Sequence, residues 1–373
     1  MSSNEPILFT PGPVRMPPSV AHNLANPPCN YHRQDAFCAM FAETVARLKA
    51  LVGLRDGAPY DVALVTATGT GTNEAALLAL ARLGRGAVAT NGFFGARAAA
   101  QARANGLDCA IIDLPDDRPI DAGALAARLD AAGGVRWLFY VSHETRVGMV
   151  NPMRDIGQVC RERGLAVGVD VISSAYAYPI DLEAAGAAIA IASSAKALMA
   201  APGIGIAFVH RDAADALRAA PPARGYYLDL IAELDRQRAD GQPRFAQPVA
   251  LHAALHAACA HLEQVGIDAH MARIQRQLDR IRAHLERLGA PAMLDPRYRS
   301  GVVLNFRLPA GLGYPELSRR LLEAGYFVLY GIPGDDSHFQ VSTIGHLDDA
   351  HVDGLCDALS RALSRDDRAA AGR

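Results

Sequence analysis

Short apolar runs alternate with amphipathic runs along most of the chain. The apolar runs are rich in alanine or β-branched residues and predict strands at Val62–Thr66, Ala87–Thr90, Cys109–Leu114, Trp137–Ser142, Leu165–Val171, Ile189–Ser193 and Gly205–His210. Apolar residues at helical spacing predict helices between most of them, at Asn73–Leu83, Gly95–Ala104, Ala122–Ala132 and Met153–Arg163. This alternation is typical of an α/β fold with a mostly parallel sheet covered on both faces. The last two strands follow each other directly, so we expect an antiparallel edge there.

The pattern changes beyond residue 211. Asp212–Gly241 is typical of loop and helix, and one long helix is predicted from Pro248 to about Leu288. A small α+β unit should follow, with strands at Gly301–Leu308, Phe327–Gly331 and Phe339–Thr343 and helices at Tyr314–Ala324 and Asp348–Leu363. We therefore predict an extended N-terminal segment (1–20), a large domain (21–265), a small C-terminal domain (266–364) and a frayed tail (365–373).

Composition narrows the class of protein. Of the 373 residues, half are apolar and a fifth are charged, and the net charge is -2, which suits an enzyme and gives no sign of a nucleic-acid surface. Apolar stretches are interrupted too early to span a membrane, and no signal peptide is apparent, so a cytoplasmic location is expected.

The six cysteines are scattered and should be reduced. His252 and His256 are spaced for a shared metal, but no third ligand is in view, so we expect no metal site.

The chain has only two lysines, and their surroundings differ. Lys49 lies in the amphipathic run Phe37–Leu54 and should be solvated. Lys196 follows the apolar run Ala187–Ala195, where burial penalises an ammonium group unless the amine is used. The obvious use is a Schiff base with an aldehyde cofactor. The alternative is a stray lysine in an arginine-rich chain.

In an open α/β sheet, ligands bind at the carboxyl ends of the strands. Thr68, Gly69 and Thr70 follow the first of these strands and run into a helix, which suits a phosphate. Neither an NTP-binding P-loop nor a complete G-x-G-x-x-G is present. Phe94 follows the second strand and could stack on a flat ring or belong to the core.

Asp170 lies near the end of the strand Leu165–Val171. A carboxylate in such an apolar strand needs a partner, and a protonated pyridine nitrogen is one; capping of the next turn through Ser173 or Ser174 is the alternative. These residues together match the parts of pyridoxal 5'-phosphate (PLP). They offer a phosphate-binding loop, an aromatic ring that can stack, an aspartate for the pyridine nitrogen and a lysine for the aldehyde.

With these residues in place, the sequence resembles the class V aminotransferases of PLP fold type I, most of all the 2-aminoethylphosphonate–pyruvate transaminases. The resemblance covers about Leu8 to Leu359 and depends on an ordered set of short stretches: Thr10–Pro13, Asn91–Arg97, Glu144–Pro152, Val169–Ser174 and Ser193–Gly203. It implies a large domain with a mostly parallel seven-stranded sheet between helices, and a small C-terminal α+β domain. It also implies a homodimer with active sites at the interface.

The resemblance assigns roles residue by residue. Lys196 would bind the cofactor covalently and then shuttle the proton, Asp170 would bind the pyridinium nitrogen, and Phe94 would stack on the ring. Thr68, Gly69 and Thr70 would hold the phosphate, and Thr145 would lie beside the ring.

The sequence departs from the family pattern in three places, one of which is Asn30–Gln34, where the acidic stretch of the aminoethylphosphonate transaminases is absent. Ala246 stands where relatives have a threonine that reaches the partner subunit's cofactor phosphate. Gln340 stands where relatives have an arginine that binds the substrate carboxylate. Glutamine is uncharged and cannot donate two parallel hydrogen bonds to a carboxylate as a guanidinium does. The candidate replacements are Arg15, Arg33 and Arg146, with Arg146 favoured by its place in the Glu144–Gly148 loop; each could instead be a solvated or ion-paired residue.

We therefore expect a PLP-dependent aminotransferase that moves an amino group from a small amine, 2-aminoethylphosphonate or an amino acid, to a 2-oxo acid such as pyruvate. The lost arginine keeps a second PLP reaction open, such as decarboxylation, elimination or racemisation. A non-catalytic PLP-binding relative and a flavodoxin-like or NAD-binding protein are further alternatives, which leave Lys196 without a use.

Overall fold

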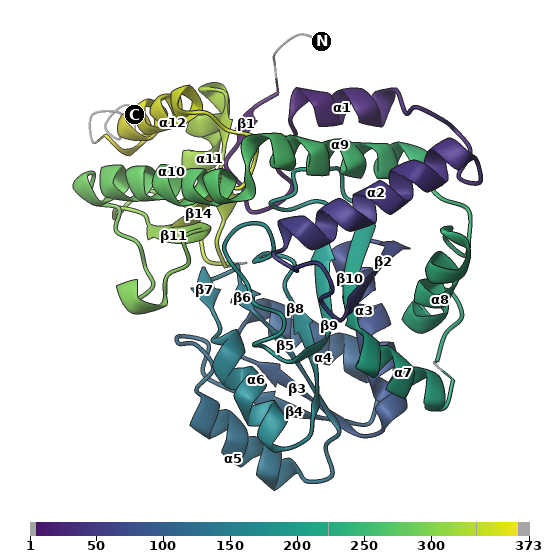
Figure 1. The fold of residues 1–373 in the computed structure, drawn as a ribbon. Helices are drawn as coiled ribbons and strands as arrows, with labels where there is room; N and C mark the ends of the chain where they lie inside the picture. Colours follow the sequence, from purple (N-terminus) through teal and green to yellow (C-terminus); the bar gives the residue numbers. More distant parts are fainter. Residues whose placement is uncertain (1–4, 223, 333, 365–373) are drawn as a thin grey trace.

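A computed structural model describes residues 5–222, 224–332 and 334–364. Its centre is a seven-stranded sheet with strand order β2-β10-β9-β8-β5-β3-β4 (Figure 1). The strands are β2 (Tyr60–Thr66), β3 (Gly86–Thr90), β4 (Cys109–Asp113), β5 (Trp137–Val141), β8 (Ala166–Asp170), β9 (Ala187–Ser193) and β10 (Ile204–His210). All seven predicted strands are thus confirmed, with small shifts in their ends. Every pairing in the sheet is parallel except the two that β10 makes.

The predicted antiparallel pair is present, but its predicted place at the edge is wrong. β10 lies between β9 and β2, because six of its seven residues are buried and such a strand is poorly suited to an open edge. The edge strand at this end of the sheet is β2. Gln237 covers part of that edge, since its side chain accepts from the Leu64 amide (3.0 Å) and donates to the Leu64 carbonyl (2.8 Å).

Helices cover both faces of the sheet because successive strand residues point to opposite sides. Trp137 and Phe139 face one apolar cluster, and Leu138 and Tyr140 face the other. The first cluster contains residues of α3 (Gly69–Leu80), α4 (Phe93–Ala104), α7 (Arg211–Ala219) and α8 (Leu230–Asp240). The second contains residues of α1 (Pro18–Ala25), α2 (Asp35–Leu51), α5 (Ala122–Ala132), α6 (Met153–Glu162) and α9 (Val249–Val265).

The long helix predicted from Pro248 to about Leu288 is in fact two helices. Gly266, with φ +84°, ends α9, and α10 (Ile267–Arg287) begins directly after it. Glycine takes this backbone conformation at little steric cost because it has no Cβ. The chain therefore changes direction at Gly266, although the apolar repeat continues into α10. The helix predicted from Asn73 begins earlier, at Gly69, because packing prevails over the weak helix propensity of glycine and threonine.

A second, smaller unit consists of α10 and the elements that follow it, together with β1 from the N-terminal segment (Figure 1). Its apolar cluster is separate from the two on the sheet. Its antiparallel sheet has the order β11-β14-β13, and the short strand β1 pairs with β12 in parallel. Its elements are β1 (Ile7–Leu8), β11 (Val303–Arg307), α11 (Tyr314–Glu323), β12 (Tyr326–Phe327), β13 (Leu329–Tyr330), β14 (His338–Ser342) and α12 (Asp349–Leu363). The remaining elements are the hairpin β6 (His143–Glu144) and β7 (Met149–Val150) and the 3-10 turns Ala81–Leu83 and Pro296–Tyr298.

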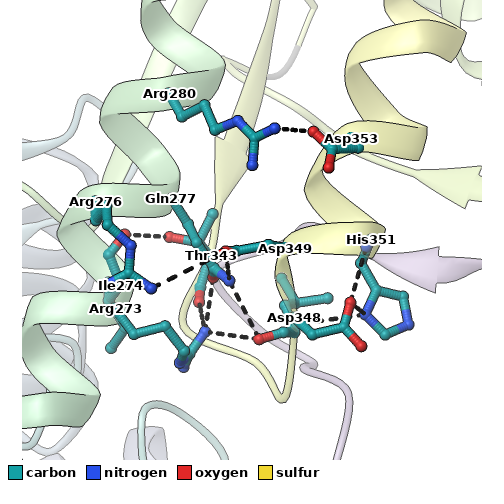
Figure 2. A network of polar contacts seen from close by, with 11 residues as sticks. Arg273, Ile274, Arg276, Gln277, Arg280, Thr343, Asp348, Asp349, His351 and Asp353 are labelled. Carbon is teal, nitrogen blue, oxygen red and sulfur yellow. Dashed lines mark hydrogen bonds and ion pairs between the residues drawn. The ribbon is translucent and has the colours of Figure 1, made fainter.

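Polar contacts fix the loop between β14 and α12 against α10 (Figure 2). Arg273 donates to the Thr343 carbonyl (3.1 Å), and the Thr343 hydroxyl donates to the Ile274 carbonyl (2.7 Å). Gln277 donates to the Leu347 carbonyl (3.3 Å). This loop is therefore held to the smaller unit before it turns towards the N-terminal segment.

The predicted division into domains at residue 265 stays a prediction, although the helix break falls beside it. The N-terminal segment reaches helix α1 at Pro18, two residues before the predicted end of the extended segment at 20. The predicted tail, residues 365–373, lies outside the described residues. In the part of the chain that is described, no helix is both long and apolar enough to cross a membrane.

Candidate active site

A cavity of about 210 Å³ opens at the carboxyl ends of the parallel strands. Six of the predicted site residues line it together: Thr68, Gly69, Thr70, Phe94, Asp170 and Lys196. They come from segments that follow β2, β3, β8 and β9, which end at the same side of the sheet. Residues as far apart in the sequence as Thr68 and Lys196 thus line one cavity, as the positions of the strand ends predicted.

The first wall of the cavity is the N-terminus of α3. Thr68 is extended and precedes the helix, and Thr70 offers a hydroxyl in its first turn. A Cβ on Gly69 would lie 2.6 Å from Cδ1 of Ile172, so glycine alone fits there without a shift. Free helix amides, hydroxyls and the helix dipole favour an anion at this point. Arg97 adds a cation beside it, with Nη1 3.5 Å from the Thr70 hydroxyl.

Lys196 follows β9 and lines the same cavity. Its Nζ donates to the Pro11 carbonyl over 2.6 Å. Burial lowers the pKa of the amine to about 8; Asp170 raises it, and Arg97 and Arg146 lower it further. An amine with this pKa is partly unprotonated near neutral pH, as a nucleophile must be.

Asp170 forms the floor of the cavity and is 5% exposed. Its Oδ2 accepts from Asn73 Nδ2 (2.5 Å) and its Oδ1 accepts from the Ile172 amide (2.8 Å). Burial raises the pKa of this carboxyl, and the two hydrogen bonds, Lys196 and Arg97 oppose that rise. Both hydrogen-bond partners are neutral, so a cation in the cavity would stabilise the carboxylate.

The aromatic wall is held by a buried carboxyl group. Glu144 accepts from the amides of Phe94 (3.0 Å) and Gly95 (2.7 Å), the second and third residues of α4. Burial raises the pKa of Glu144 to about 7 although these two hydrogen bonds lower it. Glu144 thereby caps α4 and fixes the backbone of Phe94 at the cavity.

Gln340 does not line the cavity. It is 1% exposed, and its Nε2 donates to the carbonyls of Thr145 (2.7 Å) and Arg146 (3.1 Å). Thr145 is buried and likewise lies outside the cavity lining. Gln340 therefore fixes the backbone of the loop that carries Arg146.

The three candidate arginines occupy different places. Arg146 is half-buried between the rings of Phe93 (4.8 Å) and Tyr330 (5.2 Å), and donates to the Gly331 carbonyl (2.7 Å). Arg15 is exposed and contacts His351 in α12. Arg33 is exposed and donates to Gln242 (3.0 Å). None of the three is among the residues that line the cavity, and of the three Arg146 lowers the pKa of the Lys196 amine.

Several cavity residues had no predicted role. Asn73 holds Asp170, Arg97 flanks the phosphate cup, and His143 lines the cavity. His143 is 2% exposed, burial lowers its pKa to about 4, and its Nδ1 lies 3.2 Å from the Ser173 carbonyl. Arg97 stands in the motif stretch Asn91–Arg97 and His143 directly precedes the stretch Glu144–Pro152, whereas nothing in the sequence marked Asn73.

The pair His252 and His256 is engaged in hydrogen bonds. His252 Nε2 lies 2.8 Å from Gln247 Oε1, and His256 Nδ1 lies 3.1 Å from the Thr44 hydroxyl. Within the described ranges, no group of three or more potential ligands is placed to hold a metal ion.

The cavity fits PLP part by part. The α3 N-terminus with Thr68, Thr70 and Arg97 suits the phosphate, and Phe94 presents a ring. Asp170 is a buried carboxylate without a cationic hydrogen-bond partner, which a pyridinium nitrogen would supply. When bound, PLP supplies an aldehyde that condenses with amines and a ring that accepts electrons. Fold and site thus define a PLP enzyme of fold type I.

Comparisons with known proteins agree with this class. The family model for class V aminotransferases matches residues 8–319. A 2-aminoethylphosphonate–pyruvate transaminase of Burkholderia mallei is 32% identical over 368 residues, covering 97% of this chain and 98% of that protein. The solved alanine–glyoxylate aminotransferase of Nostoc sp. superposes with a TM-score of 0.89 at 26% identity, over 98% of this chain and 97% of that one. A pyridoxamine–pyruvate aminotransferase of Mesorhizobium loti shares the fold, with a TM-score of 0.85 at 21% identity over 99% and 93% of the two chains.

This chain belongs to the class V aminotransferase family. It is a PLP-dependent transaminase, as the sequence predicted.

Proposed function

We propose that this enzyme transfers an amino group from a small amine with an anionic tail, such as 2-aminoethylphosphonate, to a 2-oxo acid such as pyruvate. The proposal takes its substrates from the named activity of the Burkholderia relative, which matches almost the whole chain. Lys196 binds the cofactor and moves the proton, Asp170 and Phe94 hold the ring, and Thr68, Gly69 and Thr70 hold the phosphate. Thr145 lies outside the cavity lining, and its backbone carbonyl accepts from Gln340.

The observation that carries the proposal is the position of Arg146. Its guanidinium lies between Phe93 and Tyr330, so its plane and direction are restricted by two rings. Gln340 donates to the backbone carbonyl of the same residue. A pre-oriented guanidinium near Lys196 suits a phosphonate or carboxylate tail, because it can donate two parallel hydrogen bonds. Arg146 thus supplies the guanidinium that is missing at position 340. Arg15 and Arg33 instead contact His351 and Gln242.

We also propose a homodimer with active sites at the interface. Tyr226 and Tyr227 are 76% and 47% exposed, and Tyr227 stacks on Phe245 with ring centroids 5.1 Å apart. An exposed aromatic cluster is typical of a surface that another chain covers. It lies directly beside Ala246, the position that faces a partner's cofactor in relatives. Analytical ultracentrifugation tests this point: a dimer is expected, and a monomer at micromolar concentration contradicts it.

The cytoplasmic location stays a prediction.

A donor panel tests the proposed substrate class. We would assay the PLP-loaded enzyme with pyruvate and, in turn, 2-aminoethylphosphonate, 3-aminopropanoate, L-serine and 2-aminoethanol, and quantify the alanine formed from pyruvate. Anionic donors should react and 2-aminoethanol should not, although it shares the aminoethyl group. Equal turnover of 2-aminoethanol would contradict a cationic tail site. Product formation in the absence of any oxo acid would instead favour the alternative PLP reactions.

A further inference from the structure

The N-terminal strap, residues 9–15, touches the catalytic lysine directly. The Pro11 carbonyl accepts a hydrogen bond from Lys196 Nζ over 2.6 Å. No side chain makes this contact, so it does not depend on which residue stands at position 11. The amine therefore has a fixed partner inside a cavity whose other polar groups suit the cofactor.

Gly12 allows the strap to come this close. A Cβ built on Gly12 would lie 2.7 Å from Nζ and 3.2 Å from Cδ of Lys196. Its φ of +141° lies in the region that favours glycine. Both the space and the backbone conformation therefore require glycine next to the amine.

The strap is held by the smaller unit rather than by the central sheet. The Phe9 amide donates to the Phe327 carbonyl (2.8 Å), and the Phe9 carbonyl accepts from Ser342 (3.0 Å). At the other end, the Arg15 carbonyl accepts from His346 (2.9 Å). His346 belongs to the loop that the contacts of Figure 2 fix against α10. The carbonyl that holds Lys196 is thus presented by a strap fixed at both ends.

Charged and titratable groups surround the same amine. Asp170 favours the ammonium form of Lys196, while Arg97 and Arg146 favour the neutral amine. His143 is neutral near pH 8, because its pKa is lowered to about 4. A carbonyl acceptor adds to this balance, since it binds an ammonium more strongly than a neutral amine.

We propose that the Pro11 carbonyl is a positioning group for Lys196, and that it holds the amine in one orientation whenever the amine is not bonded to the cofactor. The proposal rests on the assignment of Lys196 as the cofactor lysine. An amine that moves protons must stay close to its target and keep its direction, and a backbone carbonyl on a strap fixed at both ends provides both.

Capture of PLP by the cofactor-free enzyme tests this role without measuring turnover. We would follow the absorption change on mixing with PLP by stopped flow between pH 6 and pH 10, for the wild type, Gly12→Ala and Gly84→Ala. Gly84 has φ +109° and its added Cβ would meet nothing closer than 3.7 Å, so it controls for the backbone cost alone. The midpoint for Gly12→Ala should fall by roughly half a pH unit to one unit, because the ammonium loses its acceptor. Gly84→Ala should keep the wild-type midpoint.

The outcomes separate this proposal from the assignment of the lysine. If the wild type fails to capture PLP, or if Lys196→Ala captures it covalently, the assignment itself is wrong. If the wild type captures PLP and Gly12→Ala shows the same midpoint, the strap does not position the amine.

A second pair of variants covers the case in which Gly12→Ala fails to fold. The Thr10 hydroxyl donates to the Pro13 carbonyl and so closes the turn that presents Pro11. Thr10→Val removes this bond at similar size, and Thr10→Ser keeps it. The midpoint should fall for Thr10→Val and stay near the wild-type value for Thr10→Ser; equal midpoints for the two variants would overturn the proposal.

Discussion

Asn73 donates a hydrogen bond from Nδ2 to Oδ2 of Asp170 over 2.5 Å, and both side chains are buried. The two residues come from α3 and the end of β8, ninety-seven positions apart. The bond favours the ionised form of Asp170 against the cost of its burial. An ionised Asp170 is what a pyridinium nitrogen requires, so Asn73 supports cofactor binding without touching the catalytic lysine.

Replacing Asn73 by alanine should weaken PLP binding. Losing a hydrogen bond to a carboxylate removes about 1.5–3 kcal/mol, which corresponds to roughly 10- to 150-fold in the dissociation constant. Fluorescence titration of cofactor-free Asn73→Ala with PLP measures the effect. Asn23→Ala is the control, because Asn23 is half-buried and donates to the Ser19 carbonyl of its own helix. An unchanged dissociation constant for Asn73→Ala would show that Asp170 needs no such support.

Restoring the missing threonine should tighten cofactor binding. Ala246 stands where relatives carry a hydroxyl that reaches the partner subunit's cofactor phosphate. In the proposed homodimer, Ala246→Thr should lower the PLP dissociation constant by about tenfold, since a charge-assisted hydrogen bond contributes about 1.5 kcal/mol or more. Ala246→Val is the matched control, with the same shape and no hydroxyl. Equal affinities of the threonine and valine variants would mean that position 246 does not face a phosphate.

Arg146→Gln should impair the binding of anionic donors while PLP stays bound. Removing a guanidinium that binds a phosphonate costs about 1.5–3 kcal/mol, so kcat/KM for 2-aminoethylphosphonate should fall by roughly 10- to 150-fold. Steady-state kinetics with pyruvate measure this, and the absorption spectrum reports whether PLP remains bound. Arg154→Gln is the control, because the Arg154 side chain is 76% exposed on α6. A loss of equal size in Arg154→Gln, or none in Arg146→Gln, contradicts the assignment.

His252 should make the protein less stable in mild acid. Burial lowers its pKa to about 4, so the folded state binds a proton less readily than the unfolded chain does. Such a group contributes stability above its unfolded pKa of about 6.5, and that stability is lost as the pH falls towards the folded value. Between pH 7.5 and pH 5.5 its contribution should fall by about 1.4 kcal/mol.

Urea unfolding of the wild type and His252→Gln at both pH values isolates this contribution. Single-residue comparison is needed because Glu144, with its pKa raised to about 7, changes the stability in the opposite direction over the same range. The difference in unfolding free energy between the two proteins should shift in favour of His252→Gln at pH 5.5. A pH-independent difference would mean that His252 titrates as it does in the unfolded chain.

The sequence predicted the strands because each is a short apolar run whose burial does not depend on detailed packing. β8 and β9 are examples, and the residues that follow them could be assigned to one side of the sheet by topology alone. The helix break at Gly266 was missed because the apolar repeat continues across it.

The site was predicted only as far as each residue acts at its own strand end. Gln340 was expected near substrate, but its amide bonds to the backbone at 145 and 146, nearly two hundred residues away. The contact of Lys196 with Pro11 spans a similar distance. Such contacts depend on how the two units pack, and no local pattern encodes that.

A single-turnover experiment tests the central claim most directly. The PLP-loaded enzyme would be mixed with 2-aminoethylphosphonate alone, and the absorption band of the bound cofactor followed, before pyruvate is added. We predict that the band is lost to a pyridoxamine-like spectrum and that pyruvate restores it, while Lys196→Ala shows neither change. A band that persists with this donor would contradict the proposed substrate, and a full cycle in Lys196→Ala would contradict the assignment of the catalytic lysine.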